Sequence, residues 1–63
     1  MNNSRRKKLE KIWTALESIR DEEDAAYDNL PEELEDSEQG QVMDENIDTL
    51  NEAMDVIREI IDR

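Results

Sequence analysis

Residues 43–61 read MDENIDTLNEAMDVIREII, and this stretch decides the fold. Its core positions are Met43, Ile47, Leu50, Met54, Ile57 and Ile61, separated by alternating steps of four and three residues. Such spacing puts all of these side chains on one stripe of an α-helix, because 3.6 residues make one turn. The stretch therefore predicts an amphipathic helix whose apolar stripe packs against another element.

The first half of the chain carries a comparable stripe. Its apolar residues are Leu9, Ile12, Leu16, Ile19, Ala26 and Leu30, with Glu23 in the one slot of the pattern that lacks a hydrophobe. The steps between these positions again alternate between three and four residues. This pattern predicts a second amphipathic helix, which precedes the first one in the chain.

The segment between the two stripes indicates a turn. Pro31 disfavours helical geometry at Leu30, so the first helix should end near residue 28 or 29. Asp36 or Ser37 is the expected N-cap of the second helix, and residues 31–34 suit a single helical turn that starts with proline. Gly40 leaves room for Leu30, Pro31 or Tyr27 to approach its backbone. We expect helices over about 4–28 and 37–62, with a turn over 29–36, all in one domain of residues 1–63.

Two helices of similar length joined by a short turn predict an all-α fold, an antiparallel two-helix hairpin of the coiled-coil type. Residues that face each other in such a hairpin have numbers with a nearly constant sum. Leu16 with Met54 gives 70, and Ile19 with Leu50 gives 69. The prediction thus places the whole apolar stripe of the first half in the seam between the helices: Leu9, Ile12, Leu16, Ile19, Ala26 and Leu30.

Several apolar side chains lie beside the predicted seam. Trp13 follows a seam position on the first helix, and Val56 and Ile60 flank the stripe of the second. A stripe wider than the seam indicates more than one neighbour, and chains below about 70 to 80 residues commonly need oligomerisation, a metal or disulfides for stability. We therefore predict a homodimer that forms a four-helix bundle, with Trp13, Val56 and Ile60 at or near the interface.

The charge is strongly negative and unevenly distributed. The formal net charge is −11, and fifteen acids occur between Asp21 and Ile57 without one base. Acids near the end of the first helix oppose the helix dipole, so this local cost hints at a basic partner. The predicted partner-binding residues are Asp21, Glu22, Asp24, Asp28, Glu32 and Glu33. The alternative is a solvated surface that only keeps the chain in solution.

Other classes of function find little support in the composition. Cys and His are both absent, which excludes the usual zinc sites, disulfides and His-dependent triads. Because no nucleophile, base and pocket converge, we expect no enzymatic activity, no cofactor and no metal site. Negative charge argues against direct binding to nucleic acid or to anionic membranes. No apolar run approaches the roughly 20 residues of a membrane span, and we expect a cytoplasmic protein.

Three motifs carry a resemblance to a known group. They are Asn29-Leu30-Pro31-Glu32 in the turn, Ser37-Glu38-Gln39-Gly40 at the helix start, and the acidic heptad run of residues 47–53. In these motifs the chain resembles small uncharacterised acidic helical-hairpin proteins of Gram-positive bacteria and their phages. Glu35 departs from that pattern, and the residues before Asp21 fall outside it. The resemblance implies a helical hairpin and a mobile-element setting, and it implies no activity.

Two functions follow as hypotheses. In the first, the chain is a protein–protein interaction module, such as a phage accessory protein, whose acidic end binds a basic host surface. In its strongest form that surface is a nucleic-acid-binding groove, and the chain mimics a duplex. In the second, the chain is a structural or assembly hairpin whose apolar flank is the working surface.

Overall fold

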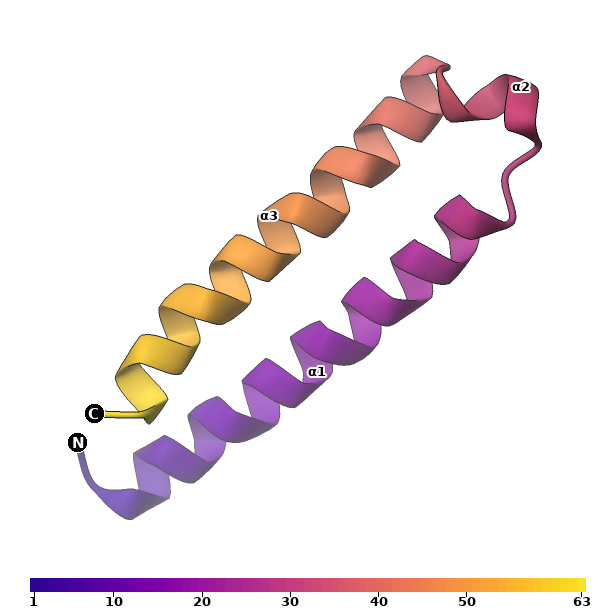
Figure 1. Cartoon of the computed structure of the whole chain (residues 1–63). Helices are drawn as coiled ribbons and strands as arrows, with labels where there is room; N and C mark the ends of the chain where they lie inside the picture. The colour runs from indigo at the N-terminus through magenta and orange to yellow at the C-terminus, as the bar shows by residue number, and fades with distance from the viewer.

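A computed structural model describes all 63 residues as two long helices side by side (Figure 1). Helix α1 spans Asn3–Asp28, the short helix α2 spans Glu32–Glu35, and helix α3 spans Glu38–Ile61. The long helices run in opposite directions, so the two termini meet at one end and α2 caps the other. The molecule measures 49 × 15 × 12 Å. The predicted all-α hairpin is confirmed.

Side chains cap the start of each long helix. The Asn2 side chain accepts a hydrogen bond from the Arg5 backbone N–H at 2.9 Å, and α1 begins at residue 3. Ser37, one of the two expected N-caps of α3, accepts from the Gly40 backbone N–H at 3.3 Å. Both contacts satisfy backbone donors that have no partner within the helix. The predicted single helical turn is present, but α2 begins one residue later than expected, so Pro31 is its N-cap and not its first helical residue.

Gly40 lets the backbone of α2 approach α3. A methyl group at this position would lie 2.6 Å from the Leu34 carbonyl oxygen and closer still to the Glu35 oxygen. The prediction of a close approach at Gly40 is therefore correct, but the approaching segment was wrong. The carbonyls of α2 contact Gly40, rather than Leu30, Pro31 or Tyr27. Gly40 is consequently buried although it lies beside the turn.

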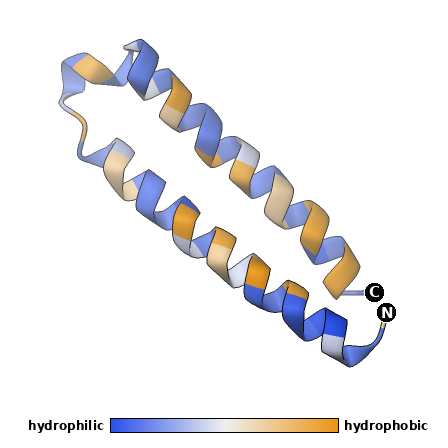
Figure 2. Cartoon of the chain, turned by 180° about the vertical axis from the view of Figure 1, so that it is seen from behind, coloured by the Kyte–Doolittle hydropathy of each residue, from blue (hydrophilic) through white to orange (hydrophobic).

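The predicted stripe of α3 forms its side of the seam. Met54 and Ile61 are 2% and 3% exposed and constitute the buried hydrophobic core. Met43, Ile47, Leu50 and Ile57 are half-buried along the same stripe. Figure 2 shows hydrophobic and hydrophilic positions alternating along both long helices, so neither helix is apolar all round. The core is consequently one line of side chains between two helices.

The predicted stripe of α1 was wrong at alternate positions. Ile12 and Ile19 are each 50% exposed, and Ala26 is also exposed. The inward side of α1 instead consists of Arg6, Leu9, Trp13, Leu16, Arg20, Glu23 and Tyr27, and Leu30 continues it after the helix end; all eight are half-buried. The correct stripe shares Leu9, Leu16, Glu23 and Leu30 with the predicted one. In place of Ile12, Ile19 and Ala26 it contains the residues that follow them, which are Trp13, Arg20 and Tyr27.

Hydrogen bonds at the tips of long side chains explain this choice. The Trp13 indole Nε1 donates to the Met54 carbonyl oxygen at 3.1 Å. Arg20 donates through Nη1 to the Asn51 side chain at 2.9 Å. Such residues bury an apolar stem while their polar tips find partners. An isoleucine in the same place offers no contact of this kind across the seam.

The antiparallel register agrees with the predicted one. Four side-chain hydrogen bonds join α1 to α3, and in each pair the residue numbers add to between 67 and 71. One of them links Glu23 Oε2 with Asn46 Nδ2 at 3.0 Å. At the open end, Arg6 donates through Nη1 to the Ile61 carbonyl oxygen, among the last carbonyls of α3. The polar contacts thus fix the alignment of the two helices.

Candidate functional site

The six predicted partner-binding acids gather at the turn end of the hairpin, and all of them are exposed. Asp21, Glu22, Asp24 and Asp28 come from the last two turns of α1, while Glu32 and Glu33 belong to α2. The structure does not bring all six to one side. Glu22 lines a groove beside Ile19 on one side of the seam. The helical spacing of Asp21, Asp24 and Asp28 places them on the other side.

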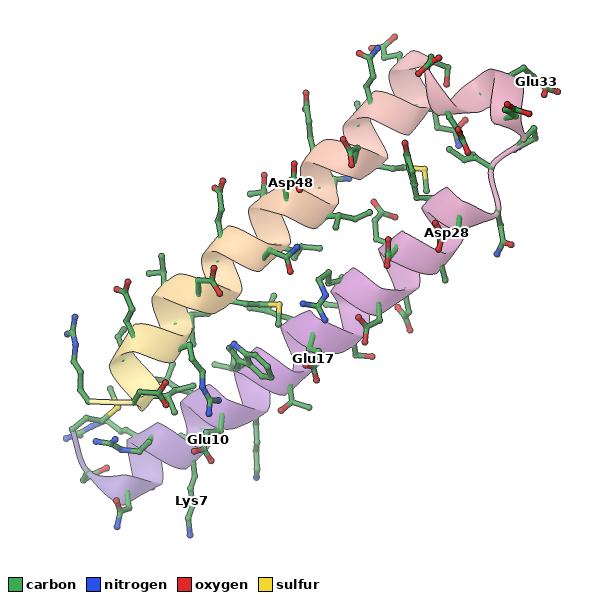
Figure 3. The ribbon with its side chains drawn as sticks, viewed as in Figure 1. Lys7, Glu10, Glu17, Asp28, Glu33 and Asp48 are labelled. Carbon is green, nitrogen blue, oxygen red and sulfur yellow. The ribbon has the colours of Figure 1, made fainter.

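Further acids continue this second side along the whole hairpin. The same heptad positions carry two bases, Lys7 and Arg58, and nine carboxylates, which we call the acidic face: Glu10, Glu17, Asp21, Asp24 and Asp28 of α1, Asp44, Asp48 and Asp55 of α3, and Asp62 at its C-cap. Figure 3 shows Glu10, Glu17 and Asp28 along α1 and Asp48 on α3, with Glu33 at the turn. The sequence prediction missed the extent of this surface, although the seven-residue spacing of the acids in the sequence indicates it.

Few of these carboxylates have a cationic neighbour. The structure contains two ion pairs, Arg20 with Asp21 at 3.0 Å and Arg58 with Asp62 at 3.4 Å. The last turn of α1 holds no basic residue, and the first turn of α2 holds three acids. The remaining acids of the turn end therefore repel one another through solvent.

The negative potential of the turn end acts on one titratable side chain. Partial burial raises the pKa of the Tyr27 hydroxyl above its ordinary value of 10.0, and the carboxylates of Asp44, Glu35, Asp36 and Asp28 raise it further. Each of these effects disfavours the phenolate. Tyr27 thus reports on the negative potential at this end of the hairpin.

The three predicted self-association residues have different surroundings. Trp13 lies in the seam of its own hairpin, with the Arg58 guanidinium carbon 5.2 Å from its ring centroid. Val56 is 59% exposed and Ile60 is half-buried, seven residues after Ala53. The structure therefore separates Trp13 from the other two, which lie on the surface beside the seam.

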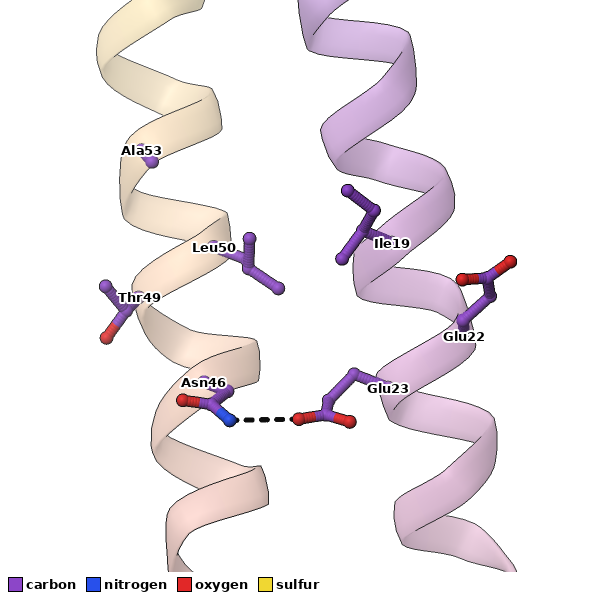
Figure 4. Close-up of a pocket in the computed structure, with 7 residues that line it drawn as sticks. All are labelled: Ile19, Glu22, Glu23, Asn46, Thr49, Leu50 and Ala53. Carbon is purple, nitrogen blue, oxygen red and sulfur yellow. Dashed lines mark hydrogen bonds between the residues drawn. The ribbon is translucent and has the colours of Figure 1, made fainter.

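An open groove between α1 and α3 marks the side that carries Val56 and Ile60. It is lined by Ile19, Glu22 and Glu23 from α1 and by Asn46, Thr49, Leu50 and Ala53 from α3 (Figure 4). A second hollow continues toward the turn past Glu23 to Val42. We call this side the apolar edge and assign to it, from the seven-residue spacing, Ile12, Ile19, Ala26, Ala53, Val56 and Ile60. Ile12 and Ile19 are the members that the sequence prediction had placed in the seam.

The apolar edge is almost free of acids. The other residues beside the seam on this side are apolar, polar or basic, with one exception. They are Arg5, Lys8, Ala15, Glu22 and Asn29 along α1 and just after it, and Gln39, Val42, Asn46, Thr49 and Arg63 along α3 and just after it. Of the 19 acids in the chain, Glu22 alone occupies such a heptad position, while Glu23 of the seam and Glu38 also line the hollows on this side. The two sides of one thin hairpin therefore differ sharply in charge. A surface that is spared acids in a chain of this composition is suited to contact with another apolar surface.

No three acidic side chains converge on a point where they could hold a metal ion. Neither long helix has the apolar length that a bilayer crossing needs. Comparisons with family models, curated proteins and solved structures found no match to this chain.

Proposed function

We propose that this chain is a cytoplasmic protein–protein interaction module whose acidic face and turn bind a basic protein surface. The observation that carries the proposal is the acidic face itself, with nine carboxylates on one side of a hairpin 49 Å long. Asp21 and Asp62 are its two members with an ion-pair partner within the chain. The other seven carboxylates are free to accept donors from lysine and arginine side chains.

The strongest form of the proposal is mimicry of a nucleic-acid duplex. A duplex presents regularly spaced negative charge along a rod, and the acidic face presents carboxylates at heptad spacing along two antiparallel helices. A groove that binds nucleic acid through phosphate contacts offers the basic residues such a rod needs. The resemblance to hairpin proteins of Gram-positive bacteria and phages gives this idea a setting, because a mobile-element accessory protein gains from blocking a host factor.

A second candidate function rests on the apolar edge. Here the chain is an assembly hairpin that dimerises into a four-helix bundle, and the acids only keep the bundle in solution. Ile12 and Ile19 are each half exposed and Val56 is 59% exposed. Covering these surfaces on both copies would stabilise a dimer by several kcal/mol, at roughly 25 cal/mol per Å². Both functions can coexist, because the two surfaces lie on opposite sides of the seam.

Charge neutralisation tests the first function. The variant Asp21→Asn, Asp24→Asn, Asp28→Asn and Glu33→Gln removes four charges from the turn end and leaves Glu22 of the apolar edge unchanged. A matched control removes four from the outer side of α3 through Glu38→Gln, Glu45→Gln, Glu52→Gln and Glu59→Gln. Each protein is immobilised and used to capture proteins from a Gram-positive host lysate at low and high salt.

The proposal predicts that captured partners are basic, are lost at high salt, and bind the turn-end variant much less than the control. Elution of the same partners by duplex DNA would support mimicry. Capture of partners that are indifferent to salt and to both variants would contradict the first function. In that case Ile19→Glu, which charges the apolar edge, should abolish their capture if the assembly function holds.

A further inference from the structure

We infer that a second copy of this chain docks on the apolar edge with its turn at the opposite end, so that α1 packs against α1 and α3 against α3. This inference rests on the proposed self-association and adds the orientation and the contacts of the dimer. Three observations carry it: the near absence of acids from the edge, the position of its apolar residues, and the position of its few charges.

Symmetry allows two ways to stack a hairpin on a copy of itself. A two-fold axis along the hairpin keeps both turns at one end and places α1 over α3 of the partner. A two-fold axis across the hairpin places the turns at opposite ends and stacks each helix on its own copy, antiparallel. The two arrangements bring different residues together, so the sequence of the edge can discriminate between them.

The residues of α1 along the edge are arranged symmetrically about Ala15. Ile12 precedes it by three residues and Ile19 follows it by four. Lys8 and Glu22 lie seven residues to either side, which is about 10 Å along the helix at 1.5 Å per residue. Antiparallel pairing of α1 with itself therefore joins Ile12 to the partner's Ile19 and Lys8 to the partner's Glu22. Both isoleucines thus meet an isoleucine of the partner, and the lysine meets an acid.

Helix α3 has its own centre of symmetry at the same level of the hairpin. Ala53 precedes Val56 by three residues and Ile60 follows it by four. The numbers of Ala15 and Val56 add to 71, which is the upper end of the range of 67 to 71 for the hydrogen-bonded pairs between α1 and α3. One axis across the hairpin thus passes close to both residues. Small side chains near this axis allow the two helical layers to approach closely.

Charge disfavours the other arrangement. With both turns at one end, Arg5, Lys8 and Arg63 of the two copies would cluster together, and so would the acids of both turns. With the turns at opposite ends, Lys8 meets the partner's Glu22, and the basic end of each copy lies toward the acidic turn of the other. The charge pattern of the edge therefore favours the arrangement that its apolar residues also satisfy.

A charge exchange tests the orientation. Lys8→Glu and Glu22→Lys alter exposed residues, and circular dichroism checks that each variant keeps its helices. With turns at opposite ends, each single change places like charges together at two sites of the dimer. The dimer dissociation constant, measured by sedimentation equilibrium, should rise about 3- to 10-fold. The double variant restores both pairs and should return to within about 2-fold of the wild type.

The other orientation predicts a different pattern. Lys8 then lies near the partner's Ile60 and Arg63, so Lys8→Glu should tighten the dimer, and Glu22→Lys should change little. This result would overturn the inferred orientation while leaving self-association intact. A wild-type chain that sediments as a 7.4 kDa monomer at millimolar concentration, with and without added salt, would overturn both proposals.

Spin labels give an independent readout, since the chain has no cysteine of its own. A label at Ala15→Cys would block the interface, so Glu33→Cys, in the exposed turn, carries the label. Turns at opposite ends place the two labels about 50 Å apart, because each lies some 18 residues beyond the axis. Turns at one end place them within roughly 25 Å, the width of a four-helix bundle. A distance in the shorter range contradicts the inference.

Discussion

The indole Nε1 of Trp13 donates a hydrogen bond to the Met54 carbonyl oxygen, 3.1 Å away on the facing helix. Met54 is the most buried hydrophobic residue of the chain, at 2% exposed. The contact joins residues 41 positions apart and is covered by the Arg58 guanidinium over the indole ring. This hydrogen bond therefore links the middle of α1 to the buried core.

The variant Trp13→Phe tests the role of this contact. Phenylalanine keeps most of the apolar ring and loses the donor, so the hairpin should lose about 1 kcal/mol of unfolding free energy. Urea unfolding followed by circular dichroism measures the change. If self-association depends on the apolar edge alone, the dimer dissociation constant should stay within about 2-fold of the wild type. A large loss of dimer with no loss of hairpin stability would instead return Trp13 to the interface.

Gly40 offers a second test, because helix propensity and packing make opposite predictions there. Gly40→Ala should gain about 1 kcal/mol from propensity. The added methyl would, however, press against the backbone carbonyls of Leu34 and Glu35, which cannot rotate away. We expect net destabilisation by about 1 to 3 kcal/mol. Gln39→Ala, on the exposed neighbouring position, is the control and should change thermal stability by less than about 0.5 kcal/mol.

The two helices differ in how far their sequences determine the seam. In α3 one apolar residue stands at every seam position, so periodicity sufficed to assign its inward face. In α1 two stripes share Leu9, Leu16 and Glu23 and differ in their alternate positions. Periodicity favours Ile12 and Ile19 because they are purely apolar. The protein uses the line of residues 6, 13, 20 and 27. The polar tips of Arg6, Trp13 and Arg20 gain partners only once the other helix is in place.

Glu23 is the one acid on the seam side of α1, and its replacement tests that assignment. Glu23→Leu would bring an aliphatic side chain beside Leu50 and remove one charge from a crowded acidic region. The lost hydrogen bond to Asn46 costs little because Asn46 is exposed. We expect stabilisation by about 1 kcal/mol in urea unfolding. Glu45→Leu, on the outer side of α3, should give no such gain, and equal effects of both changes would argue that charge alone is responsible.

Tyr27 predicts a loss of stability in alkaline solution. Partial burial and nearby carboxylates raise its pKa in the hairpin above the value of 10.0 that we expect in the unfolded chain. The folded state therefore holds this proton more tightly, and that contribution to stability is fully present below pH 10.0. It is lost as the pH rises through the pKa of the folded state. Ultraviolet absorbance of the phenolate follows a single residue, since the chain has one tyrosine.

A variant identifies the electrostatic part of that shift. Asp44→Asn removes the carboxylate that raises the pKa most after burial, so the midpoint of the tyrosine titration should fall. Asp48→Asn, one turn further along α3, serves as the control and should leave the midpoint nearly unchanged. An unaltered midpoint in Asp44→Asn would show that burial alone perturbs Tyr27.

The candidate surfaces were predictable only in part. The sequence indicated an acidic turn end, because fifteen acids without a base stand out in any window. It did not reveal that Glu22 faces away from Asp21 and Asp24, since a side of a helix is defined only by what it packs against. The sequence did not reveal the apolar edge either, because the predicted stripe of α1 placed Ile12 and Ile19 in the seam. Once Trp13 and Arg20 turn inward, Ile12 and Ile19 move to the surface and extend the line of Val56 and Ile60.

Asp28 brings stability and proposed function into direct conflict. It occupies the last turn of α1, where the helix dipole favours a cation and where the chain places none. Asp28→Lys should therefore stabilise the hairpin by about 0.6 to 2 kcal/mol, as an unfavourable charge gives way to a favourable one. Asp48→Lys makes the same change of charge in the middle of α3, away from any helix end, and should stabilise it less. Thermal unfolding of both variants at equal ionic strength isolates the effect of the helix end.

The same pair of variants bears on binding. If the turn end contacts a basic partner, Asp28→Lys should weaken capture of that partner even as it strengthens the fold, because the new cation opposes the partner's charge. A residue that costs stability and improves binding is what a functional surface is expected to hold. Unchanged stability in Asp28→Lys would show that Asp28 does not destabilise the hairpin. Unchanged capture would move the proposed contact away from the end of α1 to the remainder of the acidic face.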